Sequence, residues 1–173
     1  MSFKVLPIVS LLSLFILTSS KVHAQVSIGG GLSYGTEAET IGLTIGGLYT
    51  IEEVEHLRVG GNFVWYLPKE VSRFYDQRWF ELNINVNYTI YEKDEVSAYV
   101  VSGLNFANVA LKYEGPNSSV FSNTSDLKAG LNLGVGGEYV ITNQLKAFAE
   151  FKFTLSNFDQ AALSAGIRLP IPF

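Results

Sequence analysis

The stretch FELNINVNYTI, residues 80–90, decides the fold class of this chain. Its even positions hold Phe, Leu, Ile, Val, Tyr and Ile, and its odd positions hold Glu, Asn, Asn, Asn and Thr. Successive side chains of a β-strand point to opposite faces, whereas a helix repeats its apolar positions every three to four residues. The strict alternation therefore predicts a β-strand with one apolar face and one polar face.

The same two-residue period extends in both directions from this stretch, over residues 25–173, and no helical pattern runs for more than a few residues. Within residues 96–113 the apolar positions change from even to odd, which predicts a β-bulge near Ala107-Asn108. The periodicity predicts eight strands, at residues 26–34, 41–51, 57–67, 80–90, 96–113, 127–141, 145–155 and 163–173.

The connections between these strands alternate in character. Residues 52–56, 92–95 and 142–144 form short polar turns. The connections in the other set are residues 35–39, 68–77, 114–126 and 157–160, and two of them are long and rich in turn-forming residues. Strands joined in this way run up and down, with short turns at one end and longer loops at the other.

The composition of the polar face distinguishes two eight-stranded barrels. A soluble lipocalin-like barrel has its apolar face inside, and an outer-membrane barrel has it outside. The polar face here is mostly Gly, Asn, Ser and Thr, which suit a narrow lumen, and it lacks the many Lys and Glu of a solvated surface. We therefore predict an all-β fold, an eight-stranded antiparallel up-and-down transmembrane β-barrel, with the soluble ligand-binding barrel as an alternative.

The N-terminal segment predicts export. A short basic start precedes the apolar run at residues 5–17, and Val22-His23-Ala24 matches a cleavage site. We expect residues 1–24 to be a secretory signal peptide and residues 25–173 to be the barrel domain. The 173-residue chain has no cysteine, 16% charged residues and a formal net charge of −4, which excludes disulfide scaffolds, thiolate metal sites and general nucleic-acid binders.

The last predicted strand, Leu163 to Phe173, has apolar residues at alternate positions and ends on an aromatic residue. Together with the signal peptide and the eight strands, it resembles the outer membrane protein beta-barrel domain family, which includes the small OmpX-like barrels of Gram-negative bacteria. The resemblance implies a location in the cell outer membrane, contact with its lipids and lipopolysaccharide, and folding by the outer-membrane assembly machinery. Pro170 and Pro172 depart from the pattern, because proline cannot donate a ladder hydrogen bond.

The polar face carries a set of charged residues that the predicted phase directs into the lumen. Such a cluster lines an ion path or forms a salt-bridged plug, and we favour the plug because eight strands leave no open channel. The members of this predicted lumenal charge cluster are Arg58, Glu81, Lys128, Glu138, Lys146, Glu150, Lys152 and Arg168.

The longer loops are the other candidate site. Residues 69–78 mix both signs of charge with aromatic residues, and residues 116–125 are polar around two apolar side chains. The composition is typical of contact surfaces. The candidate interaction residues are Arg73, Phe74, Tyr75, Arg78, Val120 and Phe121.

The sequence offers little for catalysis. His56 is the only histidine of the predicted mature chain and lies in a short turn, so a Ser-His-acid site at the loop end would have no base. We expect no cofactor and no metal site. The leading interpretation is a non-catalytic outer-membrane barrel with a structural, binding or accessory-subunit role through its longer loops, possible protein partners and no nucleic acid. The alternatives are a barrel enzyme acting on lipid A or peptides, and the soluble barrel above.

Overall fold

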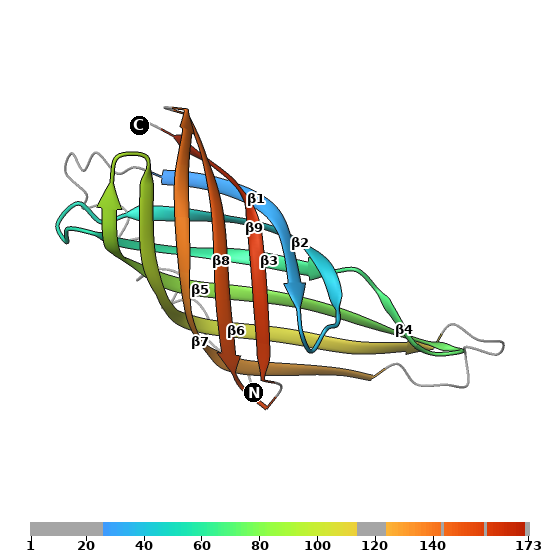
Figure 1. Ribbon diagram of the computed structural model, residues 1–173. Helices are drawn as coiled ribbons and strands as arrows, with labels where there is room; N and C mark the ends of the chain where they lie inside the picture. Colours follow the sequence, from blue (N-terminus) through green and yellow to red (C-terminus); the bar gives the residue numbers. More distant parts are fainter. Residues whose placement is uncertain (1–25, 114–123, 143, 158, 172–173) are drawn as a thin grey trace, which may run out of the picture.

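The computed structural model describes residues 26–113, 124–142, 144–157 and 159–171, and all of its regular structure is β-strand. None of these residues belongs to a helix that is long and apolar enough to cross a membrane. The strands in chain order are β1 (Val26–Gly35), β2 (Thr40–Thr50), β3 (Leu57–Tyr66), β4 (Lys69–Ser72), β5 (Tyr75–Lys93), β6 (Val96–Tyr113), β7 (Thr124–Thr142), β8 (Leu145–Leu155) and β9 (Gln160–Ile171) (Figure 1).

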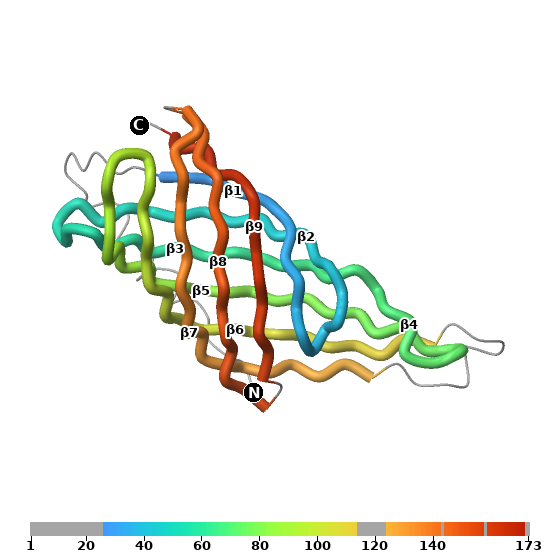
Figure 2. Tube along the Cα trace, in the orientation of Figure 1, coloured from blue at the N-terminus to red at the C-terminus, as the bar shows by residue number. Residues whose placement is uncertain are grey.

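The sheet closes on itself. Each strand pairs antiparallel with its neighbours in the order β3-β2-β1-β9-β8-β7-β6-β5, and a further pairing of β3 with β5 completes the ring. The closed arrangement leaves no long unpaired edge within the barrel (Figure 2). The structure thus confirms the predicted eight-stranded up-and-down barrel, whose two ends we call the short-turn end, where residues 51–56 lie, and the loop end, where residues 36–39 lie.

A ninth strand, β4, lies outside this ring. The sequence predicts a plain connection over residues 68–77, but Lys69–Ser72 pairs with the first residues of β5 to form a hairpin. The physical reason is the unequal length of the strands. The last β3–β5 pair is Trp65 with Phe80, and β3 ends at Tyr66, so the first residues of β5, from Tyr75 onward, have no partner on β3. Folding back as β4 supplies hydrogen-bond partners to that extension of β5.

The predicted bulge near Ala107-Asn108 is wrong. β6 pairs with β5 and with β7 in continuous register through this point. The apolar Val109 stays on the inward face, where it packs against an apolar group that includes Trp79. The alternation rule fails here because this level of the lumen is itself apolar. Among the described strands, irregular register occurs instead between Glu70 and Ser72, between Thr89 and Tyr91, and between Val140 and Thr142.

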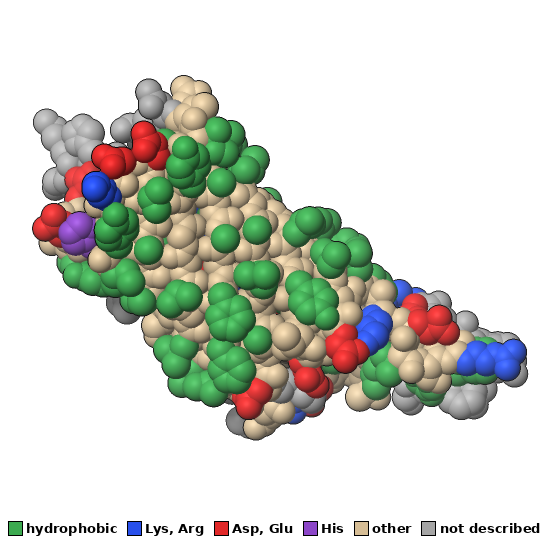
Figure 3. Space-filling model, in the orientation of Figure 1, with side chains coloured by type: hydrophobic (Ala, Val, Ile, Leu, Met, Phe, Trp, Pro, Cys, Tyr) green, Lys and Arg blue, Asp and Glu red, His purple; other side chains and the backbone are tan. Residues whose placement is uncertain are grey.

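The orientation of the two faces is as predicted. The side chains of Leu82 and Leu131 are 47% and 55% exposed on the outside of the barrel, whereas Asn83 and Asn132 are fully buried inside it. Apolar side chains are spread over the outer surface between the two ends (Figure 3). An apolar exterior and a polar interior is the arrangement of a barrel that faces lipid.

The terminal strand continues through its proline. Pro170 lies opposite Ser27 of β1, and the last β8–β9 pair joins Lys146 to Arg168. Because Pro170 lies beyond that pair, its missing N–H removes no hydrogen bond to β8. Pro172 and Phe173 lie outside the described residues.

Candidate functional site

The lumen is filled by side chains in successive layers. The layer nearest the loop end is apolar and comprises Ala38, Val64, Tyr66, Trp79 and Ala107, with Val109 packed against it. The rings of Tyr66 and Trp79 meet edge to face with their centroids 6.4 Å apart. Ala38 belongs to the β1–β2 loop and is buried, and its backbone N–H donates to Oε1 of Gln160 at 3.0 Å. A loop residue thus completes an apolar seal at this end.

Glu81 forms the next layer and is only 3% exposed. Its carboxylate accepts hydrogen bonds from Nε1 of Trp79 and Nδ2 of Asn105, both at 3.1 Å, and from Nε2 of Gln160. The three donors lie on β5, β6 and β9, at positions that the alternation directs into the lumen. A carboxylate with three donors tolerates burial, because the hydrogen bonds replace those it loses to water.

The asparagines of the alternating stretch form a network around Asn132 of β7. Nδ2 of Asn132 donates to Oδ1 of Asn83 at 2.7 Å and to Oδ1 of Asn85 at 2.9 Å. Oδ1 of Asn132 accepts from Oγ1 of Thr154 at 2.8 Å. The network joins β5, β7 and β8 across the interior, so the polar residues in this part of the lumen bond to one another.

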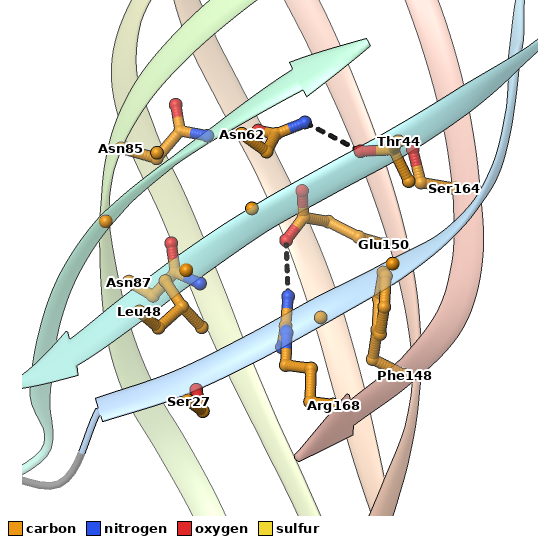
Figure 4. Close-up of a pocket in the computed structure, with 16 residues that line it drawn as sticks. Ser27, Thr44, Leu48, Asn62, Asn85, Asn87, Phe148, Glu150, Ser164 and Arg168 are labelled. Atoms are coloured by element: carbon orange, nitrogen blue, oxygen red, sulfur yellow. Dashed lines mark hydrogen bonds and ion pairs between the residues drawn. The ribbon is translucent and has the colours of Figure 1, made fainter. Parts of the chain in front are cut away.

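Charged groups occupy the half of the lumen nearer the short-turn end. Glu150 accepts from the Tyr99 hydroxyl at 3.1 Å and lies 3.7 Å from Nζ of Lys152 and 3.8 Å from Nη2 of Arg168. The Arg168–Glu150 contact joins the neighbouring strands β9 and β8 (Figure 4). Lys152 is 3% exposed, and a buried ammonium requires a partner of this kind.

Glu138 is the centre of the second charged group. Its Oε1 accepts from Nη1 of Arg58 at 2.7 Å and from Nη1 of Arg168, and its Oε2 lies 3.8 Å from Nζ of Lys146. Three cations therefore share one carboxylate. The two guanidinium groups also stack on aromatic rings: Arg58 lies 4.8 Å from the Tyr99 centroid, and Arg168 lies 4.2 Å from that of Phe148.

The structure places the eight charged residues from the sequence in three groups. Six of them gather in the short-turn half of the lumen: Arg58, Glu138, Lys146, Glu150, Lys152 and Arg168. Glu81 lies in the next layer, hydrogen-bonded to neutral donors and within electrostatic reach of Lys152. Lys128 lies nearer the loop end, with its Nζ 2.6 Å from Oδ2 of Asp126. Sequence reasoning did not identify Tyr99, although its inward phase and its phenol could have indicated a lumenal hydrogen bond.

Two small cavities adjoin the charged groups. One, of about 50 Å³, is lined by residues that include Asn87, Phe148, Glu150 and Arg168 (Figure 4). The other, of about 60 Å³, is lined mainly by Arg58, Glu138, Lys146 and Arg168, with Thr50 and Pro170. Both cavities touch Ser27 and Arg168, so they lie side by side in the short-turn half of the lumen.

The loop residues from the sequence lie at the opposite end. Arg73 and Phe74 form the turn between β4 and β5, where the guanidinium lies 5.5 Å from the Phe74 ring. The rings of Phe74 and Tyr75 lie 6.0 Å and 5.2 Å from that of Tyr113, which sequence reasoning missed. Arg78 lies further along β5. Val120 and Phe121 lie outside the described residues.

His56 lies at the short-turn end, with its Nε2 3.5 Å from Oε1 of Glu55. The Glu55 side chain is 89% exposed and that of His56 is 42% exposed. The described residues contain no group of three or more His, Cys, Asp and Glu side chains placed to hold a metal ion.

Comparison with known proteins identifies the family. The family model described as outer membrane protein beta-barrel domain matches residues 8–168, although no curated protein sequence matches the chain. The fold is similar to that of neisserial surface protein A, with a TM-score of 0.65 and 16% identity over 88% of this chain and 100% of that one. It is also similar to Ail of Yersinia pestis, with a TM-score of 0.56 and 18% identity over 84% and 97%. OprG of Pseudomonas aeruginosa gives a TM-score of 0.65 and 11% identity over 87% and 97%. The chain belongs to the outer membrane protein beta-barrel domain family, and it is a transmembrane β-barrel of the Gram-negative outer membrane.

Proposed function

We propose that this protein is a non-catalytic outer-membrane barrel that binds a protein partner through its loop end. Barrels of this family have short periplasmic turns and longer extracellular loops. The short-turn end therefore faces the periplasm and the loop end faces outward.

The observation that carries the proposal is a sheet that extends beyond the barrel. The last β3–β5 pair is Trp65 with Phe80, and the first β7–β8 pair is Leu131 with Leu155. Beyond these pairs only β4, β5, β6 and β7 continue, and they form a projecting sheet on the right of Figure 1. Its four strands offer a rigid surface, which is a better binding platform than a mobile loop.

The tip of the projecting sheet has the composition of a binding surface. Phe74, Tyr75 and Tyr113 pack together, and Arg73 lies over the Phe74 ring. Among the described residues Arg73 makes no ion pair with a carboxylate. Aromatic residues and arginine dominate the binding energy of protein interfaces. Phe74 is still 40% exposed, so a partner can bury more of it.

The interior supports a binding role over transport or catalysis. The lumenal carboxylates are paired and the asparagines are hydrogen-bonded to each other, while an apolar seal closes the loop end. Such an interior is a structural plug. The one histidine among the described residues lies at the periplasmic end, away from the projecting sheet, which disfavours the enzyme alternative.

A pull-down from native outer membranes in detergent tests the proposal. The variant Arg73→Ser with Phe74→Ser changes the tip, and Glu92→Ser with Lys93→Ser is a matched control at the periplasmic end. We expect a stoichiometric protein with the wild type and with the control, and its loss with the tip variant. Absence of any such protein, or its retention by the tip variant, contradicts the proposal. Circular dichroism checks that each variant is folded.

A further inference from the structure

The periplasmic half of the lumen has an excess of positive charge. The cations Arg58, Lys146, Lys152 and Arg168 face the carboxylates of Glu138 and Glu150, and Lys152 also faces the carboxylate of Glu81. Glu81 offsets part of the charge of Lys152, although its hydrogen bonds come from Trp79, Asn105 and Gln160 in the next layer. With Glu81 included, the four cations exceed the three carboxylates by one, and Lys146 is the most exposed of the four cations. A low-dielectric cavity lined by one sign of charge attracts counter-ions.

Arg58 has hydrogen-bonding capacity that its neighbours do not use. Its Nη1 donates to Glu138, but its Nε and Nη2 are buried and have no hydrogen-bond partner in the part of the chain that the structure describes. These two N–H groups lie on the same edge of the guanidinium plane. That edge matches the spacing of two oxygens of a carboxylate or phosphate, which is why arginine binds such groups with two parallel hydrogen bonds.

The cavity beside Arg58 has the right place and size for a small ion. It has a volume of about 60 Å³ and is lined by Arg58, Lys146 and Arg168, with Glu138 as its only acidic lining residue. It adjoins the periplasmic end, where Val26 and Pro170 form part of its wall. The apolar seal around Tyr66 and Trp79 closes the opposite end of the lumen, so access is from the periplasm.

We propose that this half of the lumen binds a small oxyanion of the phosphate class that enters from the periplasm. Three cations and one carboxylate line this cavity, and their excess of positive charge suits a phosphate monoester, which carries about −1.5 to −2 at neutral pH. Because Nε and Nη2 of Arg58 are closed to solvent, binding requires a rotation of the guanidinium that turns this two-donor edge toward the cavity, and Lys146 and Arg168 neutralise the remaining charge. The ion is either free phosphate or the phosphate group of a lipid headgroup, and the site goes beyond the proposed role of the loop end.

An internal hydrogen bond to Asn87 is the alternative to anion binding for the free edge of Arg58. Asn87 lies opposite Arg58 in the β3–β5 register, and its Oδ1 is also buried without a hydrogen-bond partner among the described residues. A side-chain rotation that joined Arg58 to Asn87 would satisfy both groups and remove the need for an anion. The test must separate these two arrangements.

The test is a titration of the folded barrel, in a maltoside detergent without phosphate headgroups, with inorganic phosphate at constant ionic strength. The NMR signal of the Arg58 Nε–H group is expected to shift and saturate with phosphate but not with chloride. Calorimetry on Arg58→Lys, which keeps the charge and loses the two-donor edge, is expected to give affinity lower by roughly tenfold. Lys128→Gln, a change nearer the loop end, is the control and should bind as the wild type does.

Two further arms complete the design. Short-chain phosphatidic acid is titrated in parallel, and tighter binding of either compound identifies the lipid headgroup or the free ion as the source. The proposal is overturned if the Arg58 signal does not saturate, if chloride shifts it equally, or if Arg58→Lys binds phosphate unchanged. It is also overturned if phosphate leaves the signal unmoved while Asn87→Ala shifts it, because that result assigns the edge to the internal bond. Circular dichroism excludes misfolded variants, and neither arm depends on the loop-end partner.

Discussion

Gly31 of β1 lies directly opposite Gly166 of β9, at the seam where the two ends of the chain close the barrel. A Cβ atom at Gly31 would lie 2.1 Å from the carbonyl oxygen of Ala165 and 2.7 Å from the Cα of Gly166. A Cβ at Gly166 would lie 2.2 Å from the carbonyl oxygen of Gly30. All of these neighbours are backbone atoms of the ladder, so they cannot move without breaking the seam.

Substitution of this glycine should therefore weaken closure. Gly31→Ala is expected to lower the free energy of unfolding by about 1–3 kcal/mol or more, the range for overpacking a tight interior. Urea unfolding in lipid vesicles, followed by circular dichroism, measures the change. Gly47→Ala is the matched control, because it lies on the outer face and its nearest contact would be 3.4 Å. Equal stability of the two variants would contradict the close packing at the seam.

Substitution of Glu81 distinguishes a lumen filled by a structural plug from one that conducts ions. Glu81→Ala leaves the buried donors of Trp79, Asn105 and Gln160 without their acceptor, and we expect a loss of at least about 2 kcal/mol. Conductance in planar bilayers should not change, because the apolar seal remains. Glu92→Ala, at the exposed end of β5, should stay within about 0.5 kcal/mol of the wild type. A large rise in conductance with unchanged stability would favour an ion path.

The two tryptophans report the orientation of the barrel wall. Trp65 is 45% exposed on the outer face, and Trp79 is 4% exposed inside the lumen. In vesicles with brominated acyl chains, the fluorescence of the Trp79→Phe variant should be strongly quenched, because only Trp65 remains and it contacts lipid. The Trp65→Phe variant should be quenched much less. The reverse result would mean that the apolar face points inward.

An ion pair at the loop end has a defined pH dependence. The hydrogen bond from Lys69, together with its charge, lowers the pKa of Glu39 below its ordinary value of 4.5. The stabilisation is therefore present above that ordinary value and is lost as the pH falls through the lowered pKa of the folded protein. The Glu39 carboxyl resonance should titrate lower in the wild type than in Lys69→Gln. Lys93→Gln, at the short-turn end, should leave the titration unchanged, and an equal shift there would indicate a general charge effect.

Alternation predicts most of the barrel because lipid and lumen impose opposite polarity on the two faces. Leu82 and Asn83 lie where the sequence directs them for that reason. The rule fails at Val109, since the seal at the loop end is apolar on its inner side as well. It also fails at β4, where four residues beyond the barrel rim pair with β5 without a lipid-facing pattern of their own.

The pairing of charges across the lumen could not be predicted in the same way. Arg58 and Glu138 are 80 positions apart, on strands β3 and β7 that are not neighbours in the sheet. Their contact depends on the stagger of every strand around the ring, which periodicity within one strand does not specify. The alternation predicts which side chains point inward, and the closed register determines which of them meet.

Some strands extend beyond the barrel ring, and their unpaired edges create a risk of polymerisation through strand pairing. Beyond the barrel ring, β4 and residues 124–130 of β7 each have one unpaired edge. An unpaired strand edge can pair with a strand of another molecule. In a crowded membrane, such edges would allow neighbouring copies to pair edge to edge into a continuous sheet. The four-residue length of β4 and the Lys128–Asp126 ion pair on β7 oppose this, because short strands and inward-pointing charges make poor templates. Copies that lose these safeguards should cluster, whereas the native molecule stays dispersed.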